Sequence, residues 1–363
     1  MPDLVGHAEL DCIAIGATVL GTGGGGDPYI GKLWAQRRTD ERGPVRLLPL
    51  EQVPDEALVV AVAMMGAPSV IVEKIPSGGE LVVALRAVER AVGAEADALI
   101  CIEAGGINST IPFALAADLG LPVVDADGMG RAFPEVQMVS FAAHGLSATP
   151  MALADERGNV TVIECQSPEW AERLGRAIVS AEGGAAVIAQ YPMRGVDLKR
   201  TAIAGTIGLA YEIGRTVLGA GRRMDSLLQA LTTQLGAAVL FRGKVIELER
   251  LTEGGFLRGF LTIAGLGEQG RTSCSISFQN ENLVASTEGE VLASVPDLIT
   301  ILEEESGHPV TTERLRFGMR VVVLAIPCAP LWRDSRGLAK AGPRCFGLDL
   351  DYVPFETRLG RRA

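Results

Sequence analysis

The stretch LICIEAGGINSTIPFALAADLGLPVVDADGMGRAFPE (99–135) decides the fold. Its pattern predicts a buried strand at 98–103, a helix at 109–119 and a second strand at 121–125, with glycine-rich loops between them. A one-helix crossover between strands of one sheet joins parallel strands, and such a crossover is almost always right-handed. Their carboxyl ends therefore lie at the same edge of the sheet.

The same alternation precedes this stretch, with a helical pattern at 7–20, a strand pattern at 57–65 and a helical pattern at 79–92. Strands joined by one-helix crossovers form a mainly parallel sheet with helices on its faces. In the last third of the chain, β patterns follow one another too closely for helices between them, which favours antiparallel pairing. We predict an α/β fold with an N-terminal three-layer α/β domain at 1–165 and a C-terminal mixed, β-rich domain at 166–363.

Composition excludes several classes of protein. The chain has 363 residues, 48% of them apolar, which is enough for two large cores. The net charge is −11 and no basic block occurs, so we expect no nucleic-acid partner. No apolar run is long enough to span a bilayer, and the N-terminus lacks the basic region of a secretory signal. Three histidines and six widely spaced cysteines form no compact zinc motif and fit a reducing, cytoplasmic location.

Three acids follow the predicted strands of the opening stretch: Glu103, Asp125 and Asp127. Ligands of open α/β sheets bind outside the carboxyl ends of the strands, so we expect these acids to form a catalytic cluster. Clustered carboxylates can divide acid and base roles, because burial and repulsion separate their pKa values. They could equally hold a divalent cation such as magnesium, and the sequence identifies no certain cofactor. The structural alternative is that they cap helices or pair with Arg131.

The segment GTGGGGDP (21–28) resembles loops that hold anions with backbone N–H groups. It lacks the Lys-Ser/Thr of a P-loop and follows a helix rather than a strand, so a plain helix connection is the alternative. The loops near the expected sheet edge supply the candidate substrate-binding residues of the first domain: Gly23, Gly24, Gly25, Gly26, Asp27, Gly105, Gly106, Asn108, Arg131 and Glu135.

In the second domain, four polar residues end a β pattern at 279–282. A polar hairpin turn explains them, but Gln279, Asn280 and Glu281 are also candidate substrate ligands. The segment 296–298 predicts the start of a helix, with Asp297 near its N-terminus. His144 and His308 have no partner at a telling spacing, and we interpret both as structural.

Six motifs, in order along about 9–354, resemble the S-methyl thiohydantoin desulfurase-like family, formerly a domain of unknown function. They are GTGGGGDP (21–28), EAGGINSTIP (103–112), DADGMGRAFPE (125–135), FQNENL (278–283), VPDLI (295–299) and GPRCFG (342–347). The resemblance implies an N-terminal α/β layer domain and a C-terminal swivelling-type domain. It also implies hydrolytic desulfurisation of a five-membered thiohydantoin ring, in the catabolism of sulfur-containing histidine derivatives. The association of some relatives with hydantoinases extends the implied substrates to cyclic amides.

Our hypothesis is a hydrolase in which Asp125 or Asp127 activates water, Glu103 is the acid, and Asn108 and Arg131 orient a small-molecule substrate. Two other functions compete with it: a regulatory module that binds a nucleotide or phosphate, and a subunit of a hydantoinase-like assembly. The high apolar content favours a homo-oligomer, and we expect no membrane partner.

Overall fold

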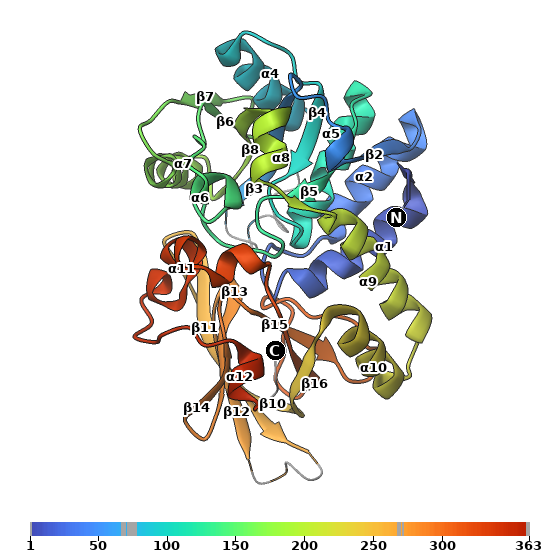
Figure 1. Ribbon diagram of the computed structural model, residues 1–363, viewed down its shortest axis with the longest axis vertical. Coiled ribbons are helices and arrows are strands. Elements are labelled where there is room, and N and C mark those ends of the chain that lie inside the picture. Colours follow the sequence, from blue (N-terminus) through green and yellow to red (C-terminus); the bar gives the residue numbers. More distant parts are fainter. Residues whose placement is uncertain (1, 67–69, 71–77, 267–269, 271, 361–363) are drawn as a thin grey trace.

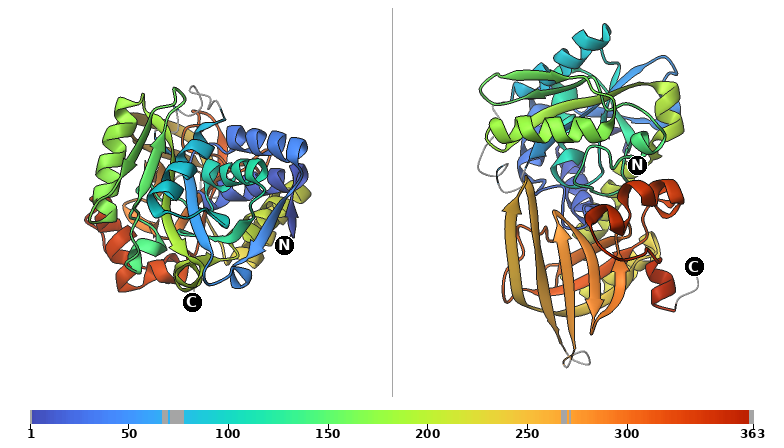
Figure 2. Two further views of the ribbon diagram at one scale, coloured as in Figure 1. Left: turned by 90° about the horizontal axis from the view of Figure 1, so that it is seen from above. Right: turned by 90° about the vertical axis from the view of Figure 1, so that its left-hand side faces the viewer.

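Two β-sheets, one above the other in Figure 1, organise the molecule. The computed structural model describes residues 2–66, 70, 78–266, 270 and 272–360. The first sheet lies with most of the helices, and the second forms the other half of the molecule (Figure 2, right). Both helices and strands are abundant, and the predicted two-part α/β fold is confirmed.

The first sheet is parallel in its core and antiparallel at its far side. Its order is β1-β2-β5-β4-β3-β8-β6-β7, with β9 (Ile203–Ala204) beside β5 and β1 (Leu4–Val5) at the edge. The predicted parallel pairing of the strands that flank the helix at 109–119 is confirmed. The parallel core consists of β2 (Val45–Pro49), β5 (Val123–Asp127), β4 (Ala98–Cys101) and β3 (Leu58–Gly66). The antiparallel side consists of β8 (Ala185–Arg194), β6 (Met151–Ala154) and β7 (Val160–Ile163).

Helices cover the first sheet and fill the space beside the second (Figures 1 and 2). The helices predicted at 7–20 and 79–92 form almost as predicted. The longer helices are α1 (His7–Leu20), α2 (Tyr29–Arg42), α4 (Glu80–Val92), α5 (Ile111–Leu119), α7 (Pro168–Ala181), α9 (Thr206–Ala220) and α10 (Met224–Leu235). No helix in the described ranges is long and apolar enough to cross a membrane.

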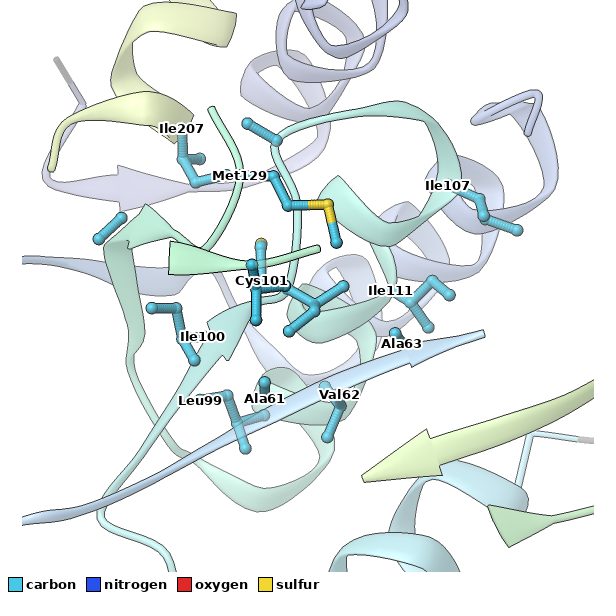
Figure 3. Close-up of a cluster of buried hydrophobic side chains, with 14 of the residues drawn as sticks. Ala61, Val62, Ala63, Leu99, Ile100, Cys101, Ile107, Ile111, Met129 and Ile207 are labelled. Atoms are coloured by element: carbon cyan, nitrogen blue, oxygen red, sulfur yellow. The ribbon is translucent and has the colours of Figure 1, made fainter. Parts of the chain in front are cut away.

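The core of the first domain lies between the parallel strands and their crossover helix (Figure 3). Val62 of β3, Ile100 of β4 and Ile111 of α5 are fully buried there. Each such side chain contributes about 1.5–3 kcal/mol to folding when it leaves water. Met129 and Ile107 extend this cluster toward the carboxyl edge of the sheet, so the core supports whatever binds at that edge.

The second sheet is antiparallel throughout, which confirms the predicted pairing. Its order is β14-β13-β12-β11-β10-β16-β15. The bounds are β10 (Ala238–Glu253), β11 (Phe256–Gly265), β12 (Ser273–Gln279), β13 (Glu281–Thr287), β14 (Glu290–Ser294), β15 (Leu298–Glu303) and β16 (Arg320–Ile326). The first sheet takes strands from both sides of residue 165, because β8 and β9 (Ile203–Ala204) belong to it.

The helix predicted to start at 296–298 is wrong, because Leu298 begins β15. The run LITILE is buried and rich in β-branched residues, and it pairs along its whole length with β16. Asp297 is fully buried and serves this arrangement. Its carboxylate accepts hydrogen bonds from the Cys328 N–H at 3.1 Å, from Arg333 at 2.6 Å and from the Tyr352 hydroxyl at 2.8 Å.

Candidate active site

A pocket lies where the carboxyl edge of the first sheet meets the second domain. Its walls are the end of β3, the loops after β4 and β5, the helix α7, the strand β8, the glycine loop and the turn between β12 and β13. Its volume is about 80 Å³. A cavity that holds one buried water has a volume of about 10–15 Å³, so the pocket has room for roughly five to eight water-sized groups. This is the size of a small ring compound.

The lining combines apolar side chains with almost as many polar ones. The apolar residues are Ala63, Met64, Met65, Ile102, Ile107, Met129, Phe133, Pro134, Val136 and Ile188. The polar side chains are Glu103, Asn108, Glu135, Glu172, Arg176, Gln190, Asn280 and Glu281. This combination is typical of sites that bind and orient a small molecule.

Glu103 follows β4 and is 4% exposed. Its Oε1 accepts a hydrogen bond from Asn108 Nδ2 at 2.7 Å, and its Oε2 accepts one from the Phe133 N–H at 3.3 Å. The amide of Asn108 is oriented in turn, because its Oδ1 accepts from the Met64 N–H at 2.8 Å. Burial, and next the charge of Glu281, raise the pKa of Glu103 well above its ordinary value.

Glu281 begins β13 and is 1% exposed. Its Oε1 accepts a hydrogen bond from the Gly25 N–H at 3.3 Å, while its Oε2 is buried and has no hydrogen-bond partner in the described part of the chain. Burial raises the pKa of Glu281 to about 8, against the charge of Arg131, which lowers it. A buried carboxyl group with a free oxygen and a pKa near neutrality is suited to proton transfer.

Arg131 is fully buried, but it does not belong to the described lining of the pocket. Its guanidinium donates to the carbonyl oxygens of Pro296 at 2.5 Å and Asp297 at 3.1 Å, and it lies 4.3 Å from the ring centre of Phe133. Burial lowers the pKa of Arg131 to about 10. Arg131 therefore connects the loop after β5 to the second domain through hydrogen bonds, and its positive charge lowers the pKa of Glu281.

The two glycine loops meet each other and Glu281. A Cβ atom at Gly24 would lie 2.1 Å from Glu281 Oε1, so only glycine allows the carboxylate to approach the loop. A Cβ atom at Gly106 would lie 2.1 Å from the carbonyl oxygen of Gly25, and Gly106 has φ +57°. The Ile107 N–H donates to the same carbonyl at 3.0 Å. Gly24 thus permits close contact between the two domains, and Gly106 permits close contact between two loops of the first domain.

The structure separates Asp125 and Asp127 from this pocket. Asp127 accepts hydrogen bonds from the N–H groups of Ala104 at 2.5 Å and Gly130 at 2.8 Å, and burial raises its pKa to about 7. Asp125 accepts from the Gly208 N–H at 2.8 Å, in the first turn of α9. Both carboxylates hold backbone in place, and neither is among the described lining residues.

The other candidates divide in the same way. Gly25, Gly26, Asn108, Glu135, Asn280 and Glu281 line the pocket with Glu103, whereas Gly23, Gly24, Asp27, Gly105, Gly106, Arg131 and Gln279 are not among its described lining residues. Asp27 pairs with Arg314. Asn280 forms the turn between β12 and β13, and its Oδ1 accepts from the Leu257 N–H at 2.8 Å. The turn predicted at 279–282 exists, but it is buried against the first domain.

Three polar lining residues were missed by the sequence analysis. Glu172 and Arg176 are four positions apart on α7 and form an ion pair of 2.7 Å, a spacing that the sequence displays. Gln190 follows five apolar residues in β8, and this first polar residue of the strand was the available signal. Among the described residues, no group of three or more His, Cys, Asp or Glu side chains is placed to hold a metal ion.

Fold and site together define a two-domain α/β protein with an acid-lined pocket between its domains. A family model described as the N-terminal domain of S-Me-THD-like proteins matches residues 8–165, and one for their C-terminal domain matches 166–355. The chain therefore belongs to the S-methyl thiohydantoin desulfurase-like family, and the resemblance found in its motifs is confirmed. Membership is consistent with a thiohydantoin-related function, and the family name suggests an enzyme.

A solved structure supports the fold. The X-ray structure of a protein from Chromobacterium violaceum is 24% identical to this chain, with a TM-score of 0.81. The match covers 97% of this chain and 99% of that one. The comparison with curated proteins found no match.

Proposed function

We propose that this protein is a hydrolase that acts on a small five-membered cyclic amide, such as an S-methyl thiohydantoin or a hydantoin-like ring. One observation carries the proposal: Glu103 and Glu281 are both buried and line the same small pocket. Two buried carboxyl groups that repel each other cannot both ionise easily, so the pair keeps a proton near neutral pH. Such a pair can give one proton and take another.

The surroundings of the two acids assign their roles. Arg131 favours the charged form of Glu281, and Glu281 Oε2 has no partner in the described chain, so Glu281 is the base that activates water. Burial and the charge of Glu281 raise the pKa of Glu103 more than the hydrogen bonds from Asn108 and the Phe133 N–H lower it, so Glu103 is the acid. This keeps Glu103 in the role predicted from the sequence and transfers the role of base from Asp125 or Asp127 to Glu281.

The reaction on an S-methyl thiohydantoin then balances without another reactant. Glu281 takes a proton from water as the water oxygen bonds to the ring carbon that bears sulfur, and Glu103 protonates the adjacent ring nitrogen. When the carbon–sulfur bond breaks, the new hydroxyl gives its proton to Glu103, and Glu281 protonates the departing thiolate. The products are methanethiol and the hydantoin, and both acids regain their starting forms.

The site gives little support to a nucleotide- or phosphate-binding module. The Gly25 N–H is already hydrogen-bonded to Glu281. Arg176 is the positively charged side chain among the described lining residues, and it is paired with Glu172. A phosphate in this place would meet two carboxyl groups with no unpaired cation in the described lining to offset its charge. A neutral ring avoids this cost.

Turnover by the purified chain tests the proposal. We expect methanethiol release from S-methyl thiohydantoins, and a loss of about 100-fold or more in kcat for Glu281→Gln and Glu103→Gln. Glu89→Gln is the matched control, because Glu89 is buried on α4, where it accepts from the Ala96 N–H at 2.9 Å. Its kcat should stay within about twofold of the unmodified chain. No turnover of any thiohydantoin or hydantoin by the chain alone would reject the proposal and favour a subunit of a larger assembly.

Three further expectations belong to this function. Elemental analysis, together with turnover measured before and after dialysis against a chelator, tests whether Glu103 and Glu281 bind a divalent cation rather than transfer protons. Size-exclusion chromatography with light scattering measures the molecular mass in solution and tests the expected homo-oligomer. All six cysteines are free, which supports the expected cytoplasmic location, and fractionation of the source cell tests it.

A further inference from the structure

Gln190 is a buried amide that the mechanism above does not use. It lies on β8, opposite Ala61 of β3, is 1% exposed and lines the pocket. Its Oε1 is buried and has no hydrogen-bond partner among the residues that the structure describes. An amide oxygen without a partner is costly to bury, and most such groups in proteins are hydrogen-bonded.

Gln190 is a polar residue in a strand that is otherwise mostly apolar. The sequence of β8 is AAVIAQYPMR, and its first five residues are apolar and buried. Methionine would fill a similar volume at position 190 without burying a polar group. The cost of the glutamine is offset if a bound molecule supplies the missing partner.

The backbone holds Gln190 in a fixed direction. Ile188 and Gln190 are two positions apart and both line the pocket, as residues on one face of a strand do. Tyr191 comes next with φ +48°, where β3 and β8 shift register between Val59 and Ala61. Bulges of this kind re-aim side chains beside active sites. The Tyr191 hydroxyl donates to the Val136 carbonyl at 3.0 Å, and this joins the bulge to the loop that forms another wall of the pocket.

We propose that Gln190 is a specificity residue that recognises the amide edge of a cyclic substrate. This inference rests on the proposed function. A primary carboxamide presents an acceptor and a donor side by side, and a ring with adjacent N–H and C=O groups presents the complementary pair. Two parallel hydrogen bonds then select rings that keep an unsubstituted N–H next to a carbonyl. They also fix the orientation of the ring relative to Glu103 and Glu281.

Kinetics of Gln190→Met test the inference. Because the contact is made to the bound ring as well as to the transition state, we expect KM to rise about tenfold while kcat stays within about threefold. Gln190→Asn keeps the amide but withdraws it by one methylene, and it should raise KM as well. An unchanged KM in either folded variant would overturn the inference.

Gln36→Leu is the matched control, since Gln36 is 4% exposed and lies on α2, outside the described lining of the pocket. Its Nε2 donates to the His7 carbonyl at 2.9 Å, so the control should lower stability and leave KM unchanged. Gln190→Met should show the opposite pattern, with unchanged or higher stability and a raised KM. A rise in KM for both variants would indicate a general loosening of the fold and would count against recognition by Gln190.

Ligand choice supplies a second readout that needs no variant. The unmodified chain should bind a ring with a free N–H about tenfold more tightly than its N-methylated form, as measured by calorimetry, and Gln190→Met should lose most of this preference. The inference would be overturned if Gln190→Met preferred the ring with a free N–H over its N-methylated form as strongly as the unmodified chain does. Turnover by the unmodified chain separates the two claims. Its absence removes the proposed function, whereas turnover with an unaltered KM in Gln190→Met removes only the role of Gln190.

Discussion

Glu281→Gln should change how the stability of the protein depends on pH. The pKa of Glu281 is about 8 in the folded chain and about 4.5 in the unfolded chain, so the folded state binds more protons between these values. Stability therefore falls as pH rises from about 4.5 to 8. At 1.36 kcal/mol for each pKa unit, the contribution of this group is at most about 5 kcal/mol. Asp127 and Glu103 shift in the same direction, so the variant reduces the slope without removing it.

Urea unfolding at pH 5 and pH 8.5 measures this effect. The unmodified chain should lose several kcal/mol of unfolding free energy between the two values, and Glu281→Gln should lose about 2–4 kcal/mol less. Glu290→Gln is a suitable control, because Glu290 is exposed on β14, and its pH dependence should match that of the unmodified chain. Identical slopes in all three proteins would show that Glu281 ionises normally, and the assignment of the base would fail.

Three other predictions follow from the same geometry. The pH profile of kcat/KM should rise with a pKa near 8 as Glu281 loses its proton, and Glu281→Gln should remove this rising limb. Gly24→Ala places a Cβ 2.1 Å from Glu281 Oε1 and should lower both stability and kcat, whereas Gly219→Ala, in open space on α9, should be neutral or slightly stabilising in thermal unfolding. Asp127→Ala leaves two backbone N–H groups without their acceptor and should cost about 2–4 kcal/mol in urea unfolding, while the folded variant keeps kcat within about tenfold. A 100-fold loss of kcat in stably folded Asp127→Ala would restore that residue as the base.

Local sequence patterns predicted the parallel core and the place of Glu103 well. The reason is that strand and helix periodicity, with the handedness of crossovers, determines where the carboxyl end of a strand must lie. The strand β4 and the helix α5 form within the predicted ranges, and Glu103 lies at the predicted edge. The direction of side chains beyond the strand ends was not predictable in this way. Asp127 turns toward backbone N–H groups of its own and the neighbouring loop.

Contacts between the domains could not be read from local pattern. Gly25 and Glu281 are 256 positions apart, and nothing in either segment specifies the other. The sequence showed that 279–282 was polar but left a hairpin turn and a ligand contact as alternatives, and the structure shows a turn whose Glu281 lines the pocket. The prediction of a helix after 296 failed for a related reason. The signal at Asp297 was local, while pairing with β16 decided the conformation.

A double-mutant cycle on Glu103 and Glu281 tests the central claim most directly. The measurement is the kcat for methanethiol release by the unmodified chain, Glu103→Gln, Glu281→Gln and the double variant. If the two acids act as one proton-transfer pair, the double variant should lose about as much activity as the worse single variant. Losses that multiply, or single variants that keep kcat within about threefold of the unmodified chain, would contradict the account.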